Sequence, residues 1–172
     1  WYFDRRDGQW GSLQLTENFA GEIRDGRLPG GRRFMVTVEP MHGTSSAVYV
    51  EPEKGAVSGA WEQSAVLNDK LVDGHALAVG DYLDIGSDQI VVGWRAMNHS
   101  GPKGPGITPP SPGIRFYTPL DEAGTKWRET EISNREVAVE DIKAADLNGD
   151  GRADFVAAAR QTKNLTIFFS QP

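Results

Sequence analysis

The sequence predicts an all-β fold, and three observations support that expectation. Helical periodicity is almost absent along the 172 residues. Short runs rich in β-branched and aromatic residues recur between clusters of Gly, Pro, Asn and Asp, a pattern typical of strands joined by turns. The chain also holds 20 Gly and 10 Pro, and their combined share exceeds the usual value of roughly 12%.

The predicted strands are short, most of them about five to eight residues long, as strands in globular proteins usually are. The runs 10–16, 61–67 and 127–132 begin with Trp, whereas 33–39 and 89–95 are rich in Val and Ile. In chain order, the predicted strands are 10–16, 33–39, 47–51, 61–67, 75–81, 89–95, 113–118, 127–132, 139–146, 154–160 and 165–170.

An internal repeat appears when these runs are aligned. The unit from 75 to 132 matches the unit from 140 to 169, and a shift of 65 positions aligns them without a gap through Arg160. A more divergent unit spans 33–67. Repeats of roughly 40 to 60 residues that hold four short strands are typical of β-propeller blades, so we expect four-stranded antiparallel blades.

This repeat predicts a partial β-propeller of three blades plus a part-blade. We expect 1–16 to end a preceding blade, 17–68 and 69–133 to be blades, and 134–172 to be a last blade without its outer strand. So few blades cannot close a ring. The partners should therefore be the remaining blades, from the same parent chain or from a second chain. Because the sequence begins with Trp rather than Met, we expect a processed product or an excised piece.

The longest predicted loop is 96–112, which is rich in Pro and Gly. Loops longer than about 12 to 15 residues are often functional. His99 lies in this loop, and we expect it to be solvated rather than catalytic.

The strongest local motif is the run from 146 to 154, which predicts a calcium loop between two strands. Oxygen-bearing side chains recur at its positions 1, 3, 5 and 9, with Gly at position 6, which suits the oxygen cage that Ca²⁺ takes. An EF-hand is rejected because position 12 is Ala157. An Asx-rich turn without an ion remains the alternative. The predicted ligands are the side chains of Asp146, Asn148, Asp150 and Asp154 and the carbonyl of Arg152.

The equivalent loop one repeat earlier, 81–89, is expected to be metal-free. It keeps the first Asp and the Gly, but Leu83, Ile85 and Gln89 stand at the other ligand positions. In the repeat before that, around 25–31, the pattern is lost.

The units resemble FG-GAP or VCBS-type repeats of calcium-loop β-propellers, and the resemblance covers nearly the whole chain. More specifically, the chain resembles the propeller of aldos-2-ulose dehydratase-like proteins. That resemblance implies a seven-bladed ring that dehydrates keto-sugars such as anhydrofructose, with a divalent metal present. The segments that carry it are 38–43, 73–77, 91–95, 139–141 and 157–160.

These family-like positions are expected to converge on the central funnel. His75 and Glu140 align at the entry to the inner strand, and either could be the base that removes the proton beside a carbonyl. Arg95, or a second divalent metal in the funnel, could supply positive charge to the carbonyl oxygen. The alternative is that His75 and Glu140 only hydrogen-bond neighbouring blades.

Three further residues complete the candidate site. Glu39 and Trp94 align with each other near the end of the second strand, and His42 lies just beyond. Trp94 and Arg95 could stack on and hold a sugar, with Glu39 beside them, and His42 is a further catalytic candidate or a turn residue.

Composition limits the remaining possibilities. The chain carries 18 basic and 24 acidic residues, and its pI near 5.1 argues against a nucleic-acid partner. It has no Cys, so disulfides and thiolate metal sites are excluded, and we expect no membrane partner. We expect an exported protein, extracellular or periplasmic. Its function is expected to be a carbohydrate-active lyase or, alternatively, a non-catalytic module that binds a glycan or a protein.

Overall fold

A computed structural model describes residues 1–40, 42–53, 59–96 and 111–171. The described residues contain strands and turns and no helix, which confirms the all-β prediction. No described segment is therefore a helix of the length and apolarity needed to cross a membrane. The strands are β1 (Tyr2–Arg6), β2 (Gln9–Leu13), β3 (Glu22–Arg27), β4 (Arg33–Glu39), β5 (Ser45–Val50), β6 (Glu62–Asn68), β7 (Gly74–Gly80), β8 (Gln89–Trp94), β9 (Gly113–Pro119), β10 (Trp127–Asn134), β11 (Asp141–Ala145), β12 (Asp154–Ala159) and β13 (Asn164–Phe168).

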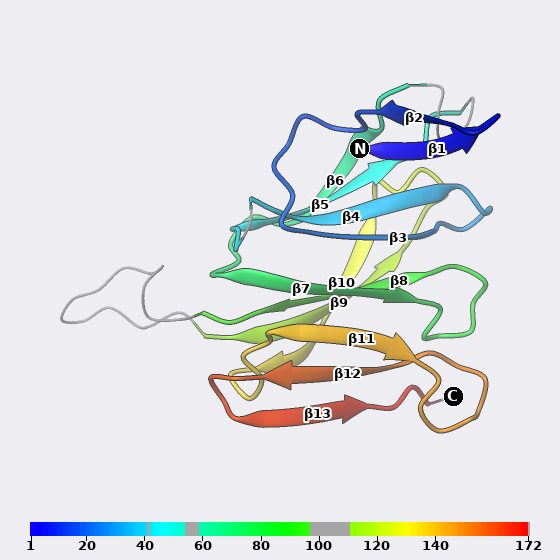
Figure 1. Ribbon diagram of the computed structural model, residues 1–172. Coiled ribbons are helices and arrows are strands. Elements are labelled where there is room, and N and C mark those ends of the chain that lie inside the picture. The colour runs from blue at the N-terminus through cyan, green and yellow to red at the C-terminus, as the bar shows by residue number, and fades with distance from the viewer. Residues whose placement is uncertain (41, 54–58, 97–110, 172) are drawn as a thin grey trace.

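The strands form four antiparallel sheets, each following chain order (Figure 1). A hairpin of β1 and β2 comes first. We call β3–β6 sheet I, β7–β10 sheet II and the three-stranded β11–β13 sheet III. The first strands of sheets I, II and III lie side by side, because β7 contacts both β3 and β11. All the sheets among the described residues are open, and none closes on itself.

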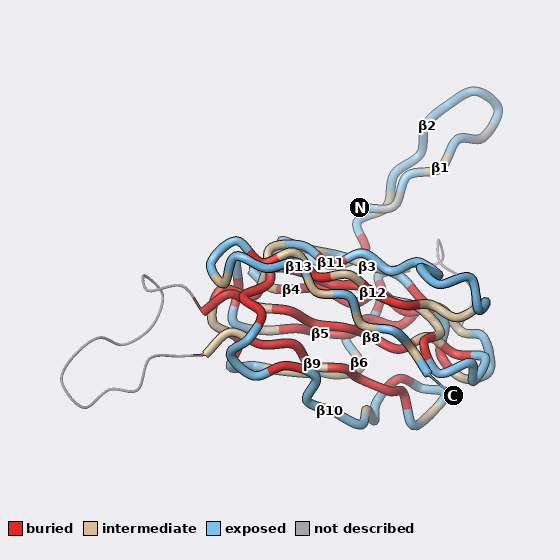
Figure 2. The backbone as a smooth tube through the Cα atoms, turned by 90° about the horizontal axis from the view of Figure 1, so that it is seen from below, coloured by how far each residue is buried: buried red, intermediate tan, exposed pale blue. Residues whose placement is uncertain are grey.

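The hydrophobic core of the described residues forms three clusters, two of them between neighbouring sheets and a third, with Met35 and Trp61, on the other face of sheet I. The first seam, between sheets I and II, includes Phe34 and Val36 from one side and Ile90 and Val92 from the other. The second seam, between sheets II and III, includes Val91, Phe116, Ile142 and Phe155. Sheet II is thus buried on both faces, which explains why β8 reads as a continuous apolar run. Figure 2 shows these buried strands in the middle and the exposed β1–β2 hairpin extending away.

The internal repeat is visible in the strand pairing. β8 and β12 begin at Gln89 and Asp154, which are 65 positions apart. Ile90 pairs with Tyr117 in sheet II, and Phe155 pairs with Phe168 in sheet III. The equivalent residues of the two sheets therefore occupy equivalent places in the ladder.

The predicted strand boundaries are mostly confirmed, with two differences. The run 33–39 coincides with β4, and the other predicted runs overlap strands with shifted ends. β3 is absent from the predicted runs, and β1 lies before the first of them, in the segment 1–16 expected to end a preceding blade. Most of the predicted long loop, 97–110, lies outside the described residues, and His99 lies there with it.

Candidate functional site

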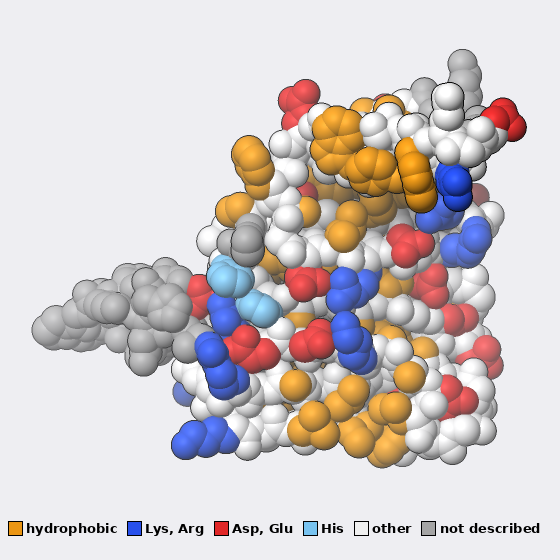
Figure 3. All heavy atoms as spheres, viewed as in Figure 1, with side chains coloured by type: hydrophobic (Ala, Val, Ile, Leu, Met, Phe, Trp, Pro, Cys, Tyr) orange, Lys and Arg blue, Asp and Glu red, His pale blue; other side chains and the backbone are white. Residues whose placement is uncertain are grey.

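The structure brings His75, Glu140, Arg95 and His42 together at one end of the strands. His75 is the second residue of β7, and Glu140 immediately precedes β11. Arg95 directly follows β8, and His42 lies in the turn between β4 and β5. Figure 3 shows two His side chains next to a group of acidic and basic side chains on this face. These four residues therefore lie close together, and their place on a central funnel stays a prediction.

Neighbouring main chain fixes the orientation of the His75 ring. Its Nδ1 lies 2.6 Å from the backbone carbonyl oxygen of Glu140. Because a carbonyl oxygen can only accept, Nδ1 carries the hydrogen and Nε2 of the neutral ring is left with the lone pair. Nε2 lies 3.8 Å from Oε2 of Glu140, too far for a hydrogen bond. The His75 side chain is 23% exposed, so solvent or a small ligand can reach it.

Glu140 lies between two guanidinium groups. Arg95 donates from Nη1 to Oε2 of Glu140 at 3.1 Å, and Nε of Arg160 lies 3.2 Å from Oε1. The Arg95 side chain is only 8% exposed, whereas that of Arg160 is 69% exposed. Among the described residues, Nε of Arg95 has no hydrogen-bond acceptor. The carboxylate thus neutralises a buried cation and joins sheet II to sheet III.

A turn that cannot accommodate larger residues places His42 over His75. The two rings stack with centroids 4.9 Å apart and planes 20° apart. The turn is tight, because a Cβ on Gly43 would overlap the backbone of Glu39. The carbonyl of Gly43 accepts a hydrogen bond from the N–H of Gly74 at 2.9 Å, which ties the turn to the start of β7.

Non-glycine residues with left-handed backbone surround this group. His42 has φ of 56°, Asp73 of 55° and Ala96 of 53°. Such conformations cost roughly 1–3 kcal/mol and persist where surrounding structure enforces them, often at functional sites. Asp73 is buried, and its carbonyl accepts the N–H of Arg95 at 3.2 Å.

Glu39 and Trp94 make their contacts elsewhere. The Glu39 carboxylate accepts hydrogen bonds from Thr37 at 2.7 Å and Tyr49 at 2.8 Å. The indole of Trp94 donates to the carbonyl of Ser111 at 2.7 Å, and the guanidinium of Arg115 lies 5.2 Å from its ring centroid. Substrate binding by these two side chains stays a prediction that no contact with His75 supports.

Sequence reasoning did not assign a role to Arg160, although a signal for it was present. Arg160 lies 65 positions after Arg95, the same shift that aligns Glu140 with His75. Each of the two repeats therefore supplies one residue at the strand entry and one arginine beyond the second strand.

Backbone donors organise the predicted calcium loop. Oδ1 of Asp146 accepts the N–H of Gly149 at 2.7 Å, and Oδ2 accepts that of Gly151 at 2.9 Å. Both glycines have positive φ, of 81° and 87°, which is why glycine suits these positions. The N–H groups, Gly151 first, hold the pKa of the Asp146 carboxyl below its usual range. The loop therefore favours an ionised carboxylate at its first position.

The remaining predicted ligands are held in the same loop. Asp154 is buried, and its two oxygens accept the N–H groups of Leu147 at 3.0 Å and Ser170 at 2.9 Å. Oδ1 of Asp150 accepts the N–H of Arg152 at 2.9 Å, and Nδ2 of Asn148 donates to Oδ2 of Asp150 at 3.1 Å.

The oxygen ligands of this loop fit a hard cation. Each ionised carboxylate has about four lone-pair sites, and because each bound N–H occupies only one of them, others are left for an ion. In the described part of the chain, however, no three His, Asp or Glu side chains stand together as a metal-holding group. Calcium binding thus stays a prediction.

The loop from Asp81 has a similar hydrogen-bonding frame, in which one of the two donors is displaced by one residue. Its carboxylate accepts the N–H groups of Ile85 at 3.0 Å and Gly86 at 2.8 Å. Asp84 and Gly86 have positive φ, at the positions equivalent to Gly149 and Gly151. The bond from the first Asp to the N–H of Gly86 or Gly151 is therefore common to both loops, and it does not depend on the oxygen side chains present only in the second.

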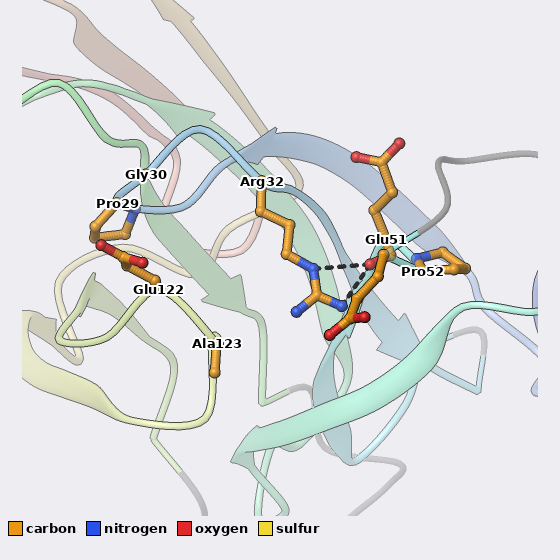
Figure 4. A pocket seen from close by; sticks show the side chains of 8 residues that line it. Pro29, Gly30, Arg32, Glu51, Pro52, Glu122 and Ala123 are labelled. Carbon is orange, nitrogen blue, oxygen red and sulfur yellow. Dashed lines mark hydrogen bonds between the residues drawn. The ribbon is translucent and has the colours of Figure 1, made fainter.

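A separate cavity of about 530 Å³ lies near the turn after β3 (Figure 4). Arg32 points across it and donates to the carbonyl of Glu51 at 2.8 and 2.6 Å. The other charged side chains that line it are acidic, from Glu51, Glu53 and Glu122. His42, His75, Arg95 and Glu140 do not line this cavity.

No family model matches this chain, and a search of curated proteins finds no match either, so the family resemblance rests on the sequence motifs alone.

Proposed function

We propose that sheets I to III are consecutive blades of a β-propeller, and that the chain belongs to a carbohydrate-active lyase that dehydrates a keto-sugar or an anhydro-sugar. The side-by-side placement of β3, β7 and β11 supports the first part, because inner strands of neighbouring blades lie this way. A seven-bladed ring, as the resemblance implies, takes its remaining blades from the same parent chain or from a second chain. An extracellular or periplasmic location accompanies this proposal.

The fixed orientation of His75 is the observation that carries the catalytic proposal. The Nδ1–H bond to the Glu140 carbonyl leaves the lone pair of Nε2 for a substrate proton. His75 is the better base of the two candidates, because the Glu140 carboxylate is engaged by Arg95 and Arg160. Glu140 is then a positioning residue.

The reaction is an elimination beside a carbonyl. Nε2 of His75 takes the proton from the carbon next to the carbonyl, and that electron pair forms the carbon–carbon double bond. The carbon–oxygen bond of the hydroxyl one carbon further on breaks, and the departing oxygen takes a proton from His42 and leaves as water. Arg95 stabilises the charge that develops on the carbonyl oxygen.

Metal ions have separate places in this proposal. Calcium, held by Asp146, Asn148, Asp150, Asp154 and the carbonyl of Arg152, stabilises the loop between β11 and β12. A second divalent ion near the funnel, as the resemblance implies, has no part in these steps, because binding to Nε2 of His75 would occupy the lone pair that takes the substrate proton.

The test is water elimination from anhydrofructose by the chain, followed through the absorbance of the conjugated carbonyl product. We expect turnover by the wild-type chain and its loss in His75→Gln. The control is Lys143→Gln, which removes the charge of an exposed side chain on β11 and should keep the activity. An active His75→Gln variant with an unchanged melting temperature contradicts the role of His75, and inactivity of the wild-type chain together with its remaining blades contradicts the lyase proposal.

A non-catalytic, calcium-stabilised module that binds a glycan or a protein is the second candidate. Glu140 favours it, because this one residue contacts His75 and Arg95 in sheet II and Arg160 in sheet III. In that case the group serves to join the sheets. Saturable binding of a saccharide without turnover, measured by titration calorimetry, would support this candidate over the lyase.

A further inference from the structure

The sequence contains one Asn-Gly pair, Asn148-Gly149, and it lies in the loop between β11 and β12. The side-chain amide of an asparagine can be attacked by the backbone nitrogen of the next residue, which closes a succinimide ring and releases ammonia. Glycine at the next position leaves that nitrogen unshielded, because glycine has no side chain. Both residues are exposed, so water can reach the ring when it forms.

The nitrogen that would attack is held by a carboxylate. The N–H of Gly149 donates to Oδ1 of Asp146 at 2.7 Å. This hydrogen lies in the plane of the peptide group, whereas the new bond to carbon forms above or below that plane. Asp146 is therefore placed to take the proton from the nitrogen while the nitrogen attacks, which is the role of a general base.

The amide that would be attacked is held at both of its polar atoms by Asp150. Oδ1 of Asn148 accepts the backbone N–H of Asp150 at 2.9 Å, and Nδ2 donates to Oδ2 of Asp150 at 3.1 Å. Negative charge develops on Oδ1 when a nucleophile adds to Cγ, and the N–H of Asp150 lies where it stabilises that charge. These two hydrogen bonds also limit rotation of the amide.

The fold holds this loop in shape from both ends. Ala145 of β11 pairs with Asp154 of β12, and the buried Asp154 carboxylate accepts the N–H of Leu147 at 3.0 Å. The loop of the preceding repeat offers no such reaction, because Leu83 stands 65 positions before Asn148. The reactive pair is thus a property of this loop alone.

We propose that Asn148 is a self-deamidating residue and that its own loop accelerates the reaction. The bond between the Gly149 nitrogen and Cγ of Asn148 forms, and the bond from Cγ to Nδ2 breaks. Asp146 takes the proton of the attacking nitrogen and returns it to solvent, and Nδ2 takes a proton from solvent and leaves as ammonia. Water then opens the ring at either carbonyl, which gives aspartate or isoaspartate at position 148.

The modification changes the loop chemically. A neutral amide is replaced by a carboxylate, so the third position of the run 146–154 gains a negative charge. In the isoaspartate product the main chain also passes through the former side-chain carbon, which lengthens the loop between Asp146 and Asp150. This reaction is independent of the catalysis proposed for His75.

The test compares the folded chain with a peptide of residues 144–155, which contains the same pair without the surrounding sheets. Both are incubated at the same pH and temperature with a chelator, and deamidation at position 148 is measured by mass spectrometry of the proteolytic fragment. We expect the folded chain to react roughly tenfold faster, because the fold holds the reacting groups together. A folded chain that reacts at the rate of the peptide, or more slowly, overturns the proposal.

Two variants test the part of Asp146. Asp146→Asn keeps the size of the side chain but exchanges the carboxylate for a poor proton acceptor, so deamidation at position 148 should slow to about the rate of the peptide. Asp81→Asn, the same change in the preceding repeat, is the matched control and should react as the wild type does. An Asp146→Asn chain with the wild-type melting temperature and the wild-type rate would show that Asp146 is not the base. If that variant is destabilised, the comparison of the wild-type chain with the peptide decides.

Discussion

At the scale of single residues, Glu140 makes contacts with His75, Arg95 and Arg160. Its carboxylate balances Arg95, which is almost completely removed from water, and its main chain orients His75. Removing one partner of a shielded ion pair costs more than the pair itself contributes, because the remaining charge is left without compensation.

Glu140→Ala should therefore destabilise the protein by about 2 kcal/mol, measured by urea unfolding. Arg160→Ala is the matched control. Its side chain is 69% exposed, and exposed ion pairs are worth about 0–1 kcal/mol, so its loss should be small. Equal losses for the two variants would contradict the assignment of Arg95 as the cation that needs Glu140.

The sequence predicted which residues approach His75 better than which way side chains point. The repeat alignment placed His75 and Glu140 together because aligned positions at the start of the first strands of neighbouring sheets meet across a seam. The Trp94 ring packs beneath Arg115, because adjacent strand residues point to opposite faces, and its role in substrate binding stays a prediction. Arg160 was missed because one arginine on an exposed strand end carries no signal by itself.

At the scale of elements, β3 shows why a strand can escape detection. Its sequence, EIRDGR, has one β-branched residue and a glycine, and it lies at the edge of sheet I. Gly26 is there for space, since a Cβ at that position would lie 2.6 Å from both Phe34 and Val79. The β-strand propensity of this segment is therefore low, because the close approach of sheet II requires a glycine within it.

Gly26→Ala should destabilise the protein by about 1–3 kcal/mol, because the added methyl group overpacks the first seam. Gly59→Ala is the control, since no atom of the described residues lies within 4 Å of the Cβ that it adds. Thermal unfolding of both variants measures the difference. A Gly26→Ala variant as stable as the wild type would show that the two sheets can separate without cost.

The calcium loop gives a second prediction at this scale. Addition of calcium to chelator-treated protein should raise the melting temperature, because an ion that binds only the folded loop stabilises the fold by mass action. Asp150→Ala should abolish this rise. Asp81→Asn, in the loop that shares the frame but lacks the ligands, should leave it intact. A melting temperature indifferent to calcium would reassign 146–154 to an ion-free Asx turn.

At the scale of the whole molecule, stability should be unequal along the stack. Sheet II is buried on both faces by the two seams, whereas sheet III packs through one face and the β1–β2 hairpin is exposed. Local opening is easiest where few apolar contacts must be broken.

Amide hydrogen exchange should therefore be slowest in β7, β8 and β9, faster in β13 and fastest in β1 and β2. Mass spectrometry of peptic fragments measures this order. Uniform protection across all the sheets would mean that the chain opens only as one unit, and it would contradict the seam-by-seam description.

The hydrogen bond from His75 to the main chain of Glu140 makes the tautomer of the imidazole independent of the charge beside it, two properties that mutations usually change together. A hydrogen bond to a side chain is lost when that side chain is replaced, but this acceptor is an atom that every amino acid possesses. Substitutions at 140 can therefore alter the charge beside the imidazole while its tautomer stays the same. Substitution at position 140 therefore changes the electrostatic environment of the ring and leaves its orientation as it is.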